Sequence, residues 1–167
     1  MYSKSKRWFT KLLVFALILS MALAPASAAF AATGNKKVTN SGKLQLILYK
    51  GQSGDSNTLS YVVSGLPSNA LVTKIEIYTG TLSYTGGMQT NHMKVTGTNK
   101  SGTDQVSWGG AGSTTIQSNY FNGTNANGTY TLSFNGTYVG GTLQGGVLLE
   151  MCTKTYTAPY ITVFYSY

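Results

Sequence analysis

Short runs in which apolar and polar residues alternate make up most of the chain after residue 42, and this pattern limits its fold more than any other feature. In "KLQLILYK" (Lys43–Lys50) three leucines stand at alternate positions, and residues 72–77 alternate in nearly the same way. Successive side chains of a β-strand point to opposite faces, so a period of two predicts half-buried strands. No apolar period of about 3.6 residues, typical of an amphipathic helix, persists along residues 29–167. The sequence therefore predicts an all-β domain.

About eight runs are expected to be strands: residues 43–50, 58–64, 71–78, 92–98, 105–108, 129–134, 147–153 and 160–167. The residues between them are typical of tight turns, since Asn-Gly-Thr occurs at Asn122, Asn127 and Asn135, and Gly-Gly occurs repeatedly. Asn-Gly supplies the positive φ angles that short hairpins need. Short strands joined by such turns predict a two-sheet β-sandwich with jelly-roll-like topology.

A Thr-Leu-Ser-aromatic sequence occurs three times, beginning at Thr58, Thr81 and Thr131. A tandem repeat would keep a fixed period, whereas these copies are 23 and 50 residues apart. We interpret the recurrence as a strand pattern, in which leucine faces the core while threonine and serine face water.

The first residues have the three parts of a secretory signal peptide: a basic start, the apolar run Leu12–Ala24 and a stretch of small residues. We expect a signal peptide over residues 1–28, with 31 as the alternative end, in a lysine-rich form typical of bacteria. Spanning a bilayer takes ~20 apolar residues. The apolar run of the leader is shorter than this, and no later apolar run is long enough. We therefore expect a secreted, extracellular protein with no membrane span after cleavage. Residues 29–42 are predicted to be a flexible lead-in, and residues 43–167 a single β-sandwich domain.

Cleavage changes the charge balance. The leader contains four of the twelve basic residues, so eight lysines then face four acids and the net charge falls from +8 to +4. Nucleic-acid binding usually needs clustered basic residues rich in arginine, but these lysines are mostly scattered and no arginine follows residue 7. We therefore expect no nucleic-acid partner. Attraction to an anionic cell-envelope polymer remains open.

Two segments are similar to a known accessory module. "VSGLPSNALVTKIEI" (Val63–Ile77) resembles the opening of the P-domain, a jelly roll that accompanies subtilisin-type convertases. "NGTYTLSF" (Asn127–Phe134) and the run that follows it to Glu150 resemble the closing strands of that family, and "NKSGT" (Asn99–Thr103) its Gly-Thr turn. The resemblance implies a jelly roll and a role beside a protease, and it assigns no site residue.

Residues suited to catalysis are scarce. His92 is the single histidine, Cys152 the single cysteine, and no G-x-S-x-G motif is present to nominate a nucleophilic serine. Cys152 lies in an apolar run and is expected to be a buried, inert thiol. We therefore predict a protein that is not an enzyme and needs no cofactor. Calcium remains open, with Asp55 and Asp104 as the candidate ligands.

Aromatic residues are the most informative surplus. Trp108 beside Gly109, and Tyr120 with Phe121 in a Gly/Asn-rich loop, could stack on sugar rings if exposed. The alternative is burial, the commoner fate of large aromatic side chains. The sequence predicts a non-catalytic extracellular binding or structural module, with a glycan or cell-surface ligand favoured. A protease-associated module of the P-domain type and a subunit of an extracellular assembly remain the alternatives.

The run Tyr160–Tyr167, "YITVFYSY", is uncharged and rich in residues that favour strands. At a sheet edge it would invite pairing with another chain, and self-association through it is open. In the middle of a sheet it would belong to the core. We favour the covered strand, because both of its faces carry apolar residues.

Overall fold

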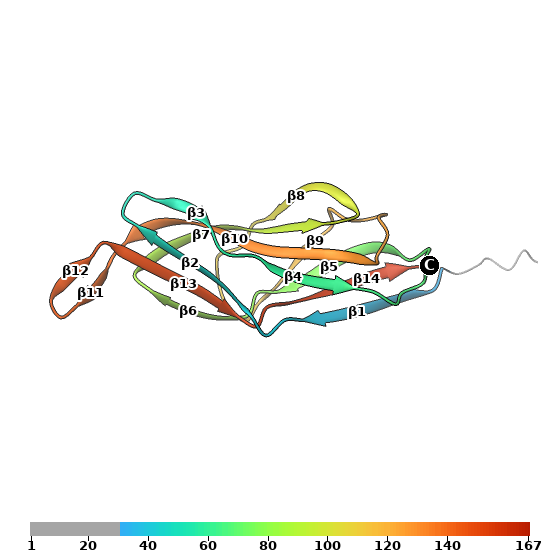
Figure 1. Ribbon diagram of the computed structural model, residues 1–167, viewed down its shortest axis with the longest axis horizontal. Helices are drawn as coiled ribbons and strands as arrows, with labels where there is room; N and C mark the ends of the chain where they lie inside the picture. The colour runs from blue at the N-terminus through green and yellow to red at the C-terminus, as the bar shows by residue number, and fades with distance from the viewer. Residues whose placement is uncertain (1–30) are drawn as a thin grey trace, which may run out of the picture. The chain divides into compact units, whose positions relative to one another are not determined.

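The computed structural model describes residues 31–167, so the signal peptide predicted over residues 1–28 lies outside the described residues (Figure 1). Residues 32–167 form one unit. Its fourteen strands, counted in the described residues, are β1 Thr33–Thr39, β2 Lys43–Tyr49, β3 Ser53–Asp55, β4 Leu59–Val63, β5 Leu71–Tyr78, β6 Thr81–Thr85, β7 Gly87–Gly97, β8 Lys100–Val106, β9 Thr115–Ser118, β10 Gly128–Gly140, β11 Thr142–Gln144, β12 Val147–Leu149, β13 Met151–Thr157 and β14 Tyr160–Ser166. The predicted all-β sandwich is confirmed, with more strands than expected.

Three antiparallel sheets build the sandwich. Sheet A has the order β1-β14-β5-β9, sheet B the order β2-β13-β6, and sheet C the order β3-β10-β7-β8, with β4 also paired to β10. Strands β1, β5 and β13 are followed directly by β2, β6 and β14, so sheets A and B have the same strand order and are two halves of one layer (Figure 1). Sheet C is the other layer. The short β11–β12 hairpin lies at the end of the domain opposite the C-terminus.

A corner separates sheets A and B where three chain segments turn together. Gly80 has φ = +90°, and a Cβ atom there would lie 2.5 Å from the carbonyl oxygen of Thr157. Ala158 also has a positive φ, of 52°, and its N–H donates to the carbonyl of Gly42 over 2.9 Å. The corner therefore requires a glycine at residue 80, because a side chain there would be both strained and in collision.

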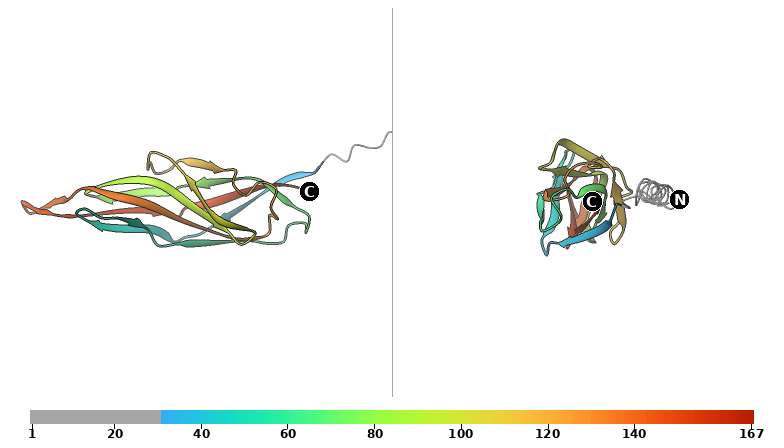
Figure 2. Two further views of the ribbon diagram at one scale, coloured as in Figure 1. Left: turned by 90° about the horizontal axis from the view of Figure 1, so that it is seen from above. Right: turned by 90° about the vertical axis from the view of Figure 1, so that its right-hand side faces the viewer.

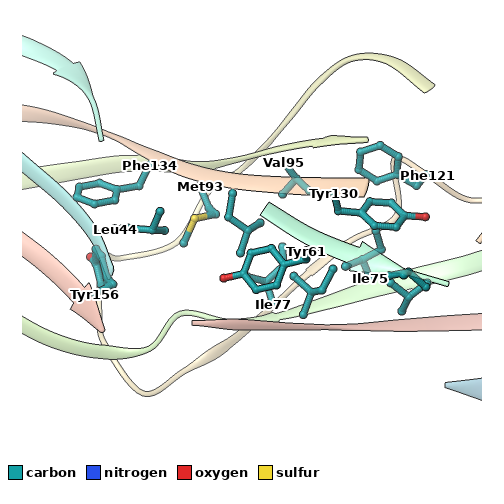
Figure 3. Packing of buried hydrophobic residues seen from close by; sticks show 14 of the residues in the cluster. Leu44, Tyr61, Ile75, Ile77, Met93, Val95, Phe121, Tyr130, Phe134 and Tyr156 are labelled. Atoms are coloured by element: carbon teal, nitrogen blue, oxygen red, sulfur yellow. The ribbon is translucent and has the colours of Figure 1, made fainter. Parts of the chain in front are cut away.

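The two layers face each other (Figure 2), and one hydrophobic core lies between them (Figure 3). It follows the predicted alternation: Tyr130, Leu132 and Phe134 of β10 are buried, as are Ile75 and Ile77 of β5. Figure 3 shows Phe121 and Tyr156 at opposite ends of this cluster. The buried side chains thus join both halves of the divided layer to sheet C.

Two predictions concern the neighbouring strands β1 and β14. The flexible lead-in predicted over residues 29–42 is wrong for Thr33–Thr39, which pairs with β14 along its whole length. This strand was hard to predict, because it leaves five of its residues exposed and shows little apolar alternation. Strand β14 pairs with β1 on one edge and β5 on the other, so it is the covered strand and offers no open edge for self-association.

The three Thr-Leu-Ser-aromatic segments all fall on strands, the first with Thr58 just before β4, but they differ in burial. Tyr61 in the first copy, and Leu132 and Phe134 in the third, lie in the core. In the second copy, on β6, Leu82 is half-buried and Tyr84 is exposed.

Among the described residues, no helix is long and apolar enough to cross a bilayer.

Candidate binding pocket

The two layers differ in width along the domain, and this difference creates a pocket. Beside sheet A, β9 borders β5, and β8 borders the part of β7 from Met93 to Gly97. Strands β8 and β9 do not extend beside sheet B. Among the described strands, the outer edge of β6 and the outer edge of the first half of β7 therefore have no pairing strand. A pocket of about 300 Å³ opens there, lined by Leu82, Tyr84, Gly86, Gly87, Met88, Gln89, Val139 and Lys154.

Two glycines pack closely against residues in and beside this pocket. The chain passes from β6 to β7 through Gly86 and Gly87, where a Cβ atom on Gly86 would collide with Cys152 Cβ at 2.9 Å. In the loop after β8, a Cβ atom on Gly110 would lie 2.7 Å from Thr90 Oγ1. Both positions therefore require glycine, because a side chain there would collide with neighbouring atoms.

Lys154 forms the base of the pocket. It lies on β13 and faces inward between Cys152 and Tyr156, with only 8% of its surface exposed. Its Nζ donates to the carbonyl oxygen of Met88 over 2.9 Å and to Thr90 Oγ1 over 2.7 Å. Burial lowers the pKa of Lys154 from its usual 10.5, because removal from water disfavours the charged amine.

A chain of hydrogen bonds holds the Thr90 partner in place. Thr90 Oγ1 lies 3.2 Å from the Tyr156 hydroxyl, which donates to the carbonyl of Gly110 over 2.6 Å. A consistent arrangement has Lys154 donating to Thr90, Thr90 to Tyr156 and Tyr156 to Gly110. Because each hydroxyl both accepts and donates, the network fixes the position of the lysine.

The rim of the pocket is mostly apolar. Tyr84 on β6 is 66% exposed. Val139 at the end of β10 is also exposed, and Leu82 is half-buried. Tyr84 and Lys154 are direct neighbours in the register of β6 with β13. The site thus combines an exposed aromatic ring with a fixed ammonium group in an apolar recess.

The three aromatic residues predicted to bind a glycan do not form one surface. Trp108 does not line the pocket, and its half-buried ring packs on Tyr156 with centroids 5.8 Å apart. Tyr120 has the ammonium of Lys100 over its ring at 4.1 Å. Phe121 is fully buried, so it cannot stack on a ligand. The alternative considered from the sequence was burial. It is correct for Phe121, and Trp108 and Tyr120 are partly buried.

The calcium candidates lie on strands β3 and β8, at opposite edges of sheet C. Asp55 accepts from Asn135 Nδ2 and from Lys94 Nζ, each over 2.6 Å, and these two hydrogen bonds hold the pKa of its carboxyl below the usual value. Asp104 accepts from Ser118 Oγ over 2.6 Å. Within residues 31–167 no three His, Cys, Asp or Glu side chains are grouped as a metal site would need. The two aspartates therefore do not form a shared site.

The remaining candidates for chemistry, Cys152 and His92, are not part of the pocket lining. Cys152 is buried, and burial raises the pKa of its thiol. His92 on β7 has a buried Nε2 for which the described residues provide no hydrogen-bond partner.

Lys154 was not recognised from the sequence, where it was counted among scattered lysines. The signal that could have found it is its register: in "MCTKTYT" the lysine shares one strand face with Cys152 and Tyr156. A lysine on the inward face of an otherwise buried strand is unusual.

Comparisons with known proteins identify no family. No protein-family model matches this chain, and no curated protein does. One similar solved structure is described as the crystal structure of FLHE, with a TM-score of 0.46 and 13% identity, covering 82% of this chain and 100% of that one. A likeness at this level carries no inference about function. The P-domain resemblance stays a prediction.

Proposed function

We propose that this protein is a secreted, non-catalytic binding module that holds one unit of an extracellular glycan or cell-envelope polymer in the pocket between β6 and β7. The observation that carries this proposal is the placement of Tyr84, an exposed ring, beside a recess that contains a fixed hydrogen-bond donor, Lys154. Small-molecule sites typically combine an apolar surface with a few fixed polar groups.

The chemistry of the lining suits a sugar ring. A tyrosine ring offers a flat apolar face to the C–H face of a sugar, while Gln89 and Lys154 offer donors to its oxygens. At about 300 Å³ the pocket is at the small end of ligand sites, so it fits one unit of a polymer rather than a long segment. The lining offers no pair of carboxylates, the arrangement on which glycoside hydrolysis commonly depends, and this supports binding rather than cleavage.

The test is retention of the secreted protein on a panel of immobilised polysaccharides and cell-wall preparations. Tyr84→Ala should weaken retention by about 1–3 kcal/mol, the effect of removing an aromatic stacking platform in nucleic-acid binding sites. The matched control is Tyr49→Ala, because Tyr49 is similarly exposed, at 56%, but lies on β2 and does not line the pocket. Retention on no polymer, or equal retention of the two variants, would contradict the proposal.

The β11–β12 hairpin favours a second candidate, a subunit of an extracellular assembly. Leu143, Val147 and Leu148 are all exposed on this hairpin, and grouped exposed apolar side chains are typical of interaction surfaces. If a second copy covers them, light scattering should show multimers that dissociate in a Leu143→Asp, Leu148→Asp variant. A wild-type protein that stays monomeric at high concentration would exclude this candidate.

A further inference from the structure

We infer that the unit bound in this pocket is acidic, and that the ammonium of Lys154 binds its anionic oxygens, which belong to the carboxylate of a sugar acid or to a polymer phosphate. This inference rests on the proposed function and specifies the class of ligand. Both sources present the same chemistry to the lysine, a negatively charged oxygen that accepts a hydrogen bond.

The first support is the uncompensated charge of Lys154. Three other lysines, Lys50, Lys74 and Lys94, each form an ion pair with a carboxylate over 2.5–2.6 Å, and all three are more exposed. In the described part of the chain no carboxylate lies within 4.0 Å of Lys154, whose two partners are neutral oxygens. A buried charge without a counter-charge is destabilising. An anionic ligand would supply the missing partner.

The second support is an unused donor. An ammonium group has three N–H bonds, and the two hydrogen bonds of Lys154 to Met88 and Thr90 account for two of them. Because those partners are a backbone carbonyl and a hydroxyl held by its own network, the ammonium is fixed in position while one N–H remains free for a ligand. Little ordering of the lysine is then needed on binding, which favours affinity.

The third support is the approach to the ammonium. Lys154 is one of the residues that line the pocket, so its side chain borders the space a ligand would occupy. The lining carries no Asp or Glu that would repel an anion. Apolar side chains such as Leu82 and Val139 line the site, and an apolar surrounding strengthens attraction between opposite charges.

Proton linkage supplies a further signature. Burial lowers the pKa of Lys154, and an anion bound beside the amine would raise it again. Binding should therefore take up protons at alkaline pH, and affinity should fall as pH rises through the lowered pKa. Two titrations in buffers of different ionisation enthalpy measure this uptake directly.

The decisive experiment is calorimetric titration of the secreted protein at physiological salt with three probes. The first is an oligogalacturonate, the second is the same oligomer with its carboxylates reduced to alcohols, and the third is a poly(glycerol phosphate). We expect at least one anionic probe to bind at least about tenfold more tightly than the reduced oligomer, as expected for a hydrogen bond to a charged group.

The matched variants are Lys154→Met and Lys43→Met, which remove the same charge from inside and outside the pocket. Lys43 is exposed at the start of β2. Lys154→Met should lose the preference for the anionic probe and the proton uptake, while Lys43→Met should keep both. A difference between the carboxylate and phosphate probes identifies the source of the anion.

The outcomes separate the two proposals. If the reduced oligomer binds as tightly as the acidic probes, or if the two lysine variants behave alike, the inference about the anion is overturned while glycan binding stands. If none of the probes binds and no polymer retains the protein, both proposals fail. Should Lys154→Met not fold, the comparison of probes and the proton uptake of the wild-type protein decide the matter.

Discussion

The two halves of the divided layer use their central strands in opposite ways. In sheet A, β14 lies between β1 and β5 and buries Ile161 and Val163, and β9 extends the sheet beyond β5. In sheet B, β13 lies between β2 and β6 and buries Lys154 beside Cys152, and no described strand continues beyond β6. Sheet A thus has one more strand and a central strand that buries only apolar side chains. Sheet B is narrower, and it borders the pocket and buries a charged residue. Under the proposed function, sheet A mainly supplies stability, while sheet B supplies the binding pocket.

The largest effect should come from placing a lysine in sheet A. Val163→Lys introduces a charge on the central strand β14, where residue 163 is fully buried among apolar residues. We expect a loss of about 3–5 kcal/mol in the free energy of unfolding, as for an uncompensated buried charge. Urea denaturation followed by circular dichroism measures it. Thr162→Lys, on the opposite face of the same strand, is the control and should change stability by less than about 0.5 kcal/mol. Equal stability of the two variants would show that sheet A tolerates a buried lysine as sheet B does.

The corner between the halves should give the next largest effect. Gly80→Ala combines a strained positive φ with a collision against Thr157, so we expect it to destabilise the protein by about 1–3 kcal/mol. Gly51→Ala is the matched control, since φ is also positive, at +79°, but nothing lies within 4 Å of the added Cβ atom. The difference between the two variants isolates the collision at the corner. If Gly80→Ala produces two separate unfolding transitions, the halves are independent rather than parts of one layer.

The alternation of single strands was predictable from the sequence, and the relations between strands were not. Leu44, Leu46 and Leu48 are buried as their spacing predicts, because this pattern depends on a single strand. The corner depends on Gly42, Gly80 and Ala158, which are distant in sequence, and none of them marks a corner by itself.

The pocket was hidden for a similar reason. Its lining comes from β6, β7, β10 and β13, so no sequence motif contains it. The sequence favoured Trp108, Tyr120 and Phe121 because Gly and Asn surround them, yet an aromatic residue in a polar loop can equally fold back onto the core, as Phe121 does. The unusual position of Lys154 could in principle have been predicted from the sequence, because it shares one face of β13 with Cys152 and Tyr156.

Alkaline pH should test the buried tyrosines, which lie in sheets B and C. Burial raises the pKa of Tyr130 to about 12 and raises the pKa values of Tyr61 and Tyr156 as well. Tyrosines of the unfolded chain lose their protons from pH about 10, so between pH 10 and 12 the unfolded state binds fewer protons and stability falls as pH rises. Tyr130→Phe should make this fall in stability shallower than in the wild-type protein. Denaturation at several pH values, with tyrosine ionisation followed by ultraviolet absorbance, checks this.

The smallest effect concerns Lys154 itself and has the opposite sign. Replacing a buried ion pair by apolar residues of similar volume is often neutral or stabilising by about 1–4 kcal/mol, and Lys154 is buried without even a counter-charge. The two hydrogen bonds of Lys154 offset part of that gain, so we expect Lys154→Met to raise the free energy of unfolding by about 1 kcal/mol at neutral pH.

In the folded wild-type protein the pKa of Lys154 is lowered, so below its usual 10.5 the unfolded state binds more protons and wild-type stability rises with pH. The advantage of Lys154→Met should therefore shrink as pH increases, and it should be measured below pH 10, where the tyrosines remain protonated. A variant that is less stable than wild type at neutral pH would show that Lys154 supports the fold as Val163 does, and the division between a stabilising sheet A and a binding sheet B would no longer hold.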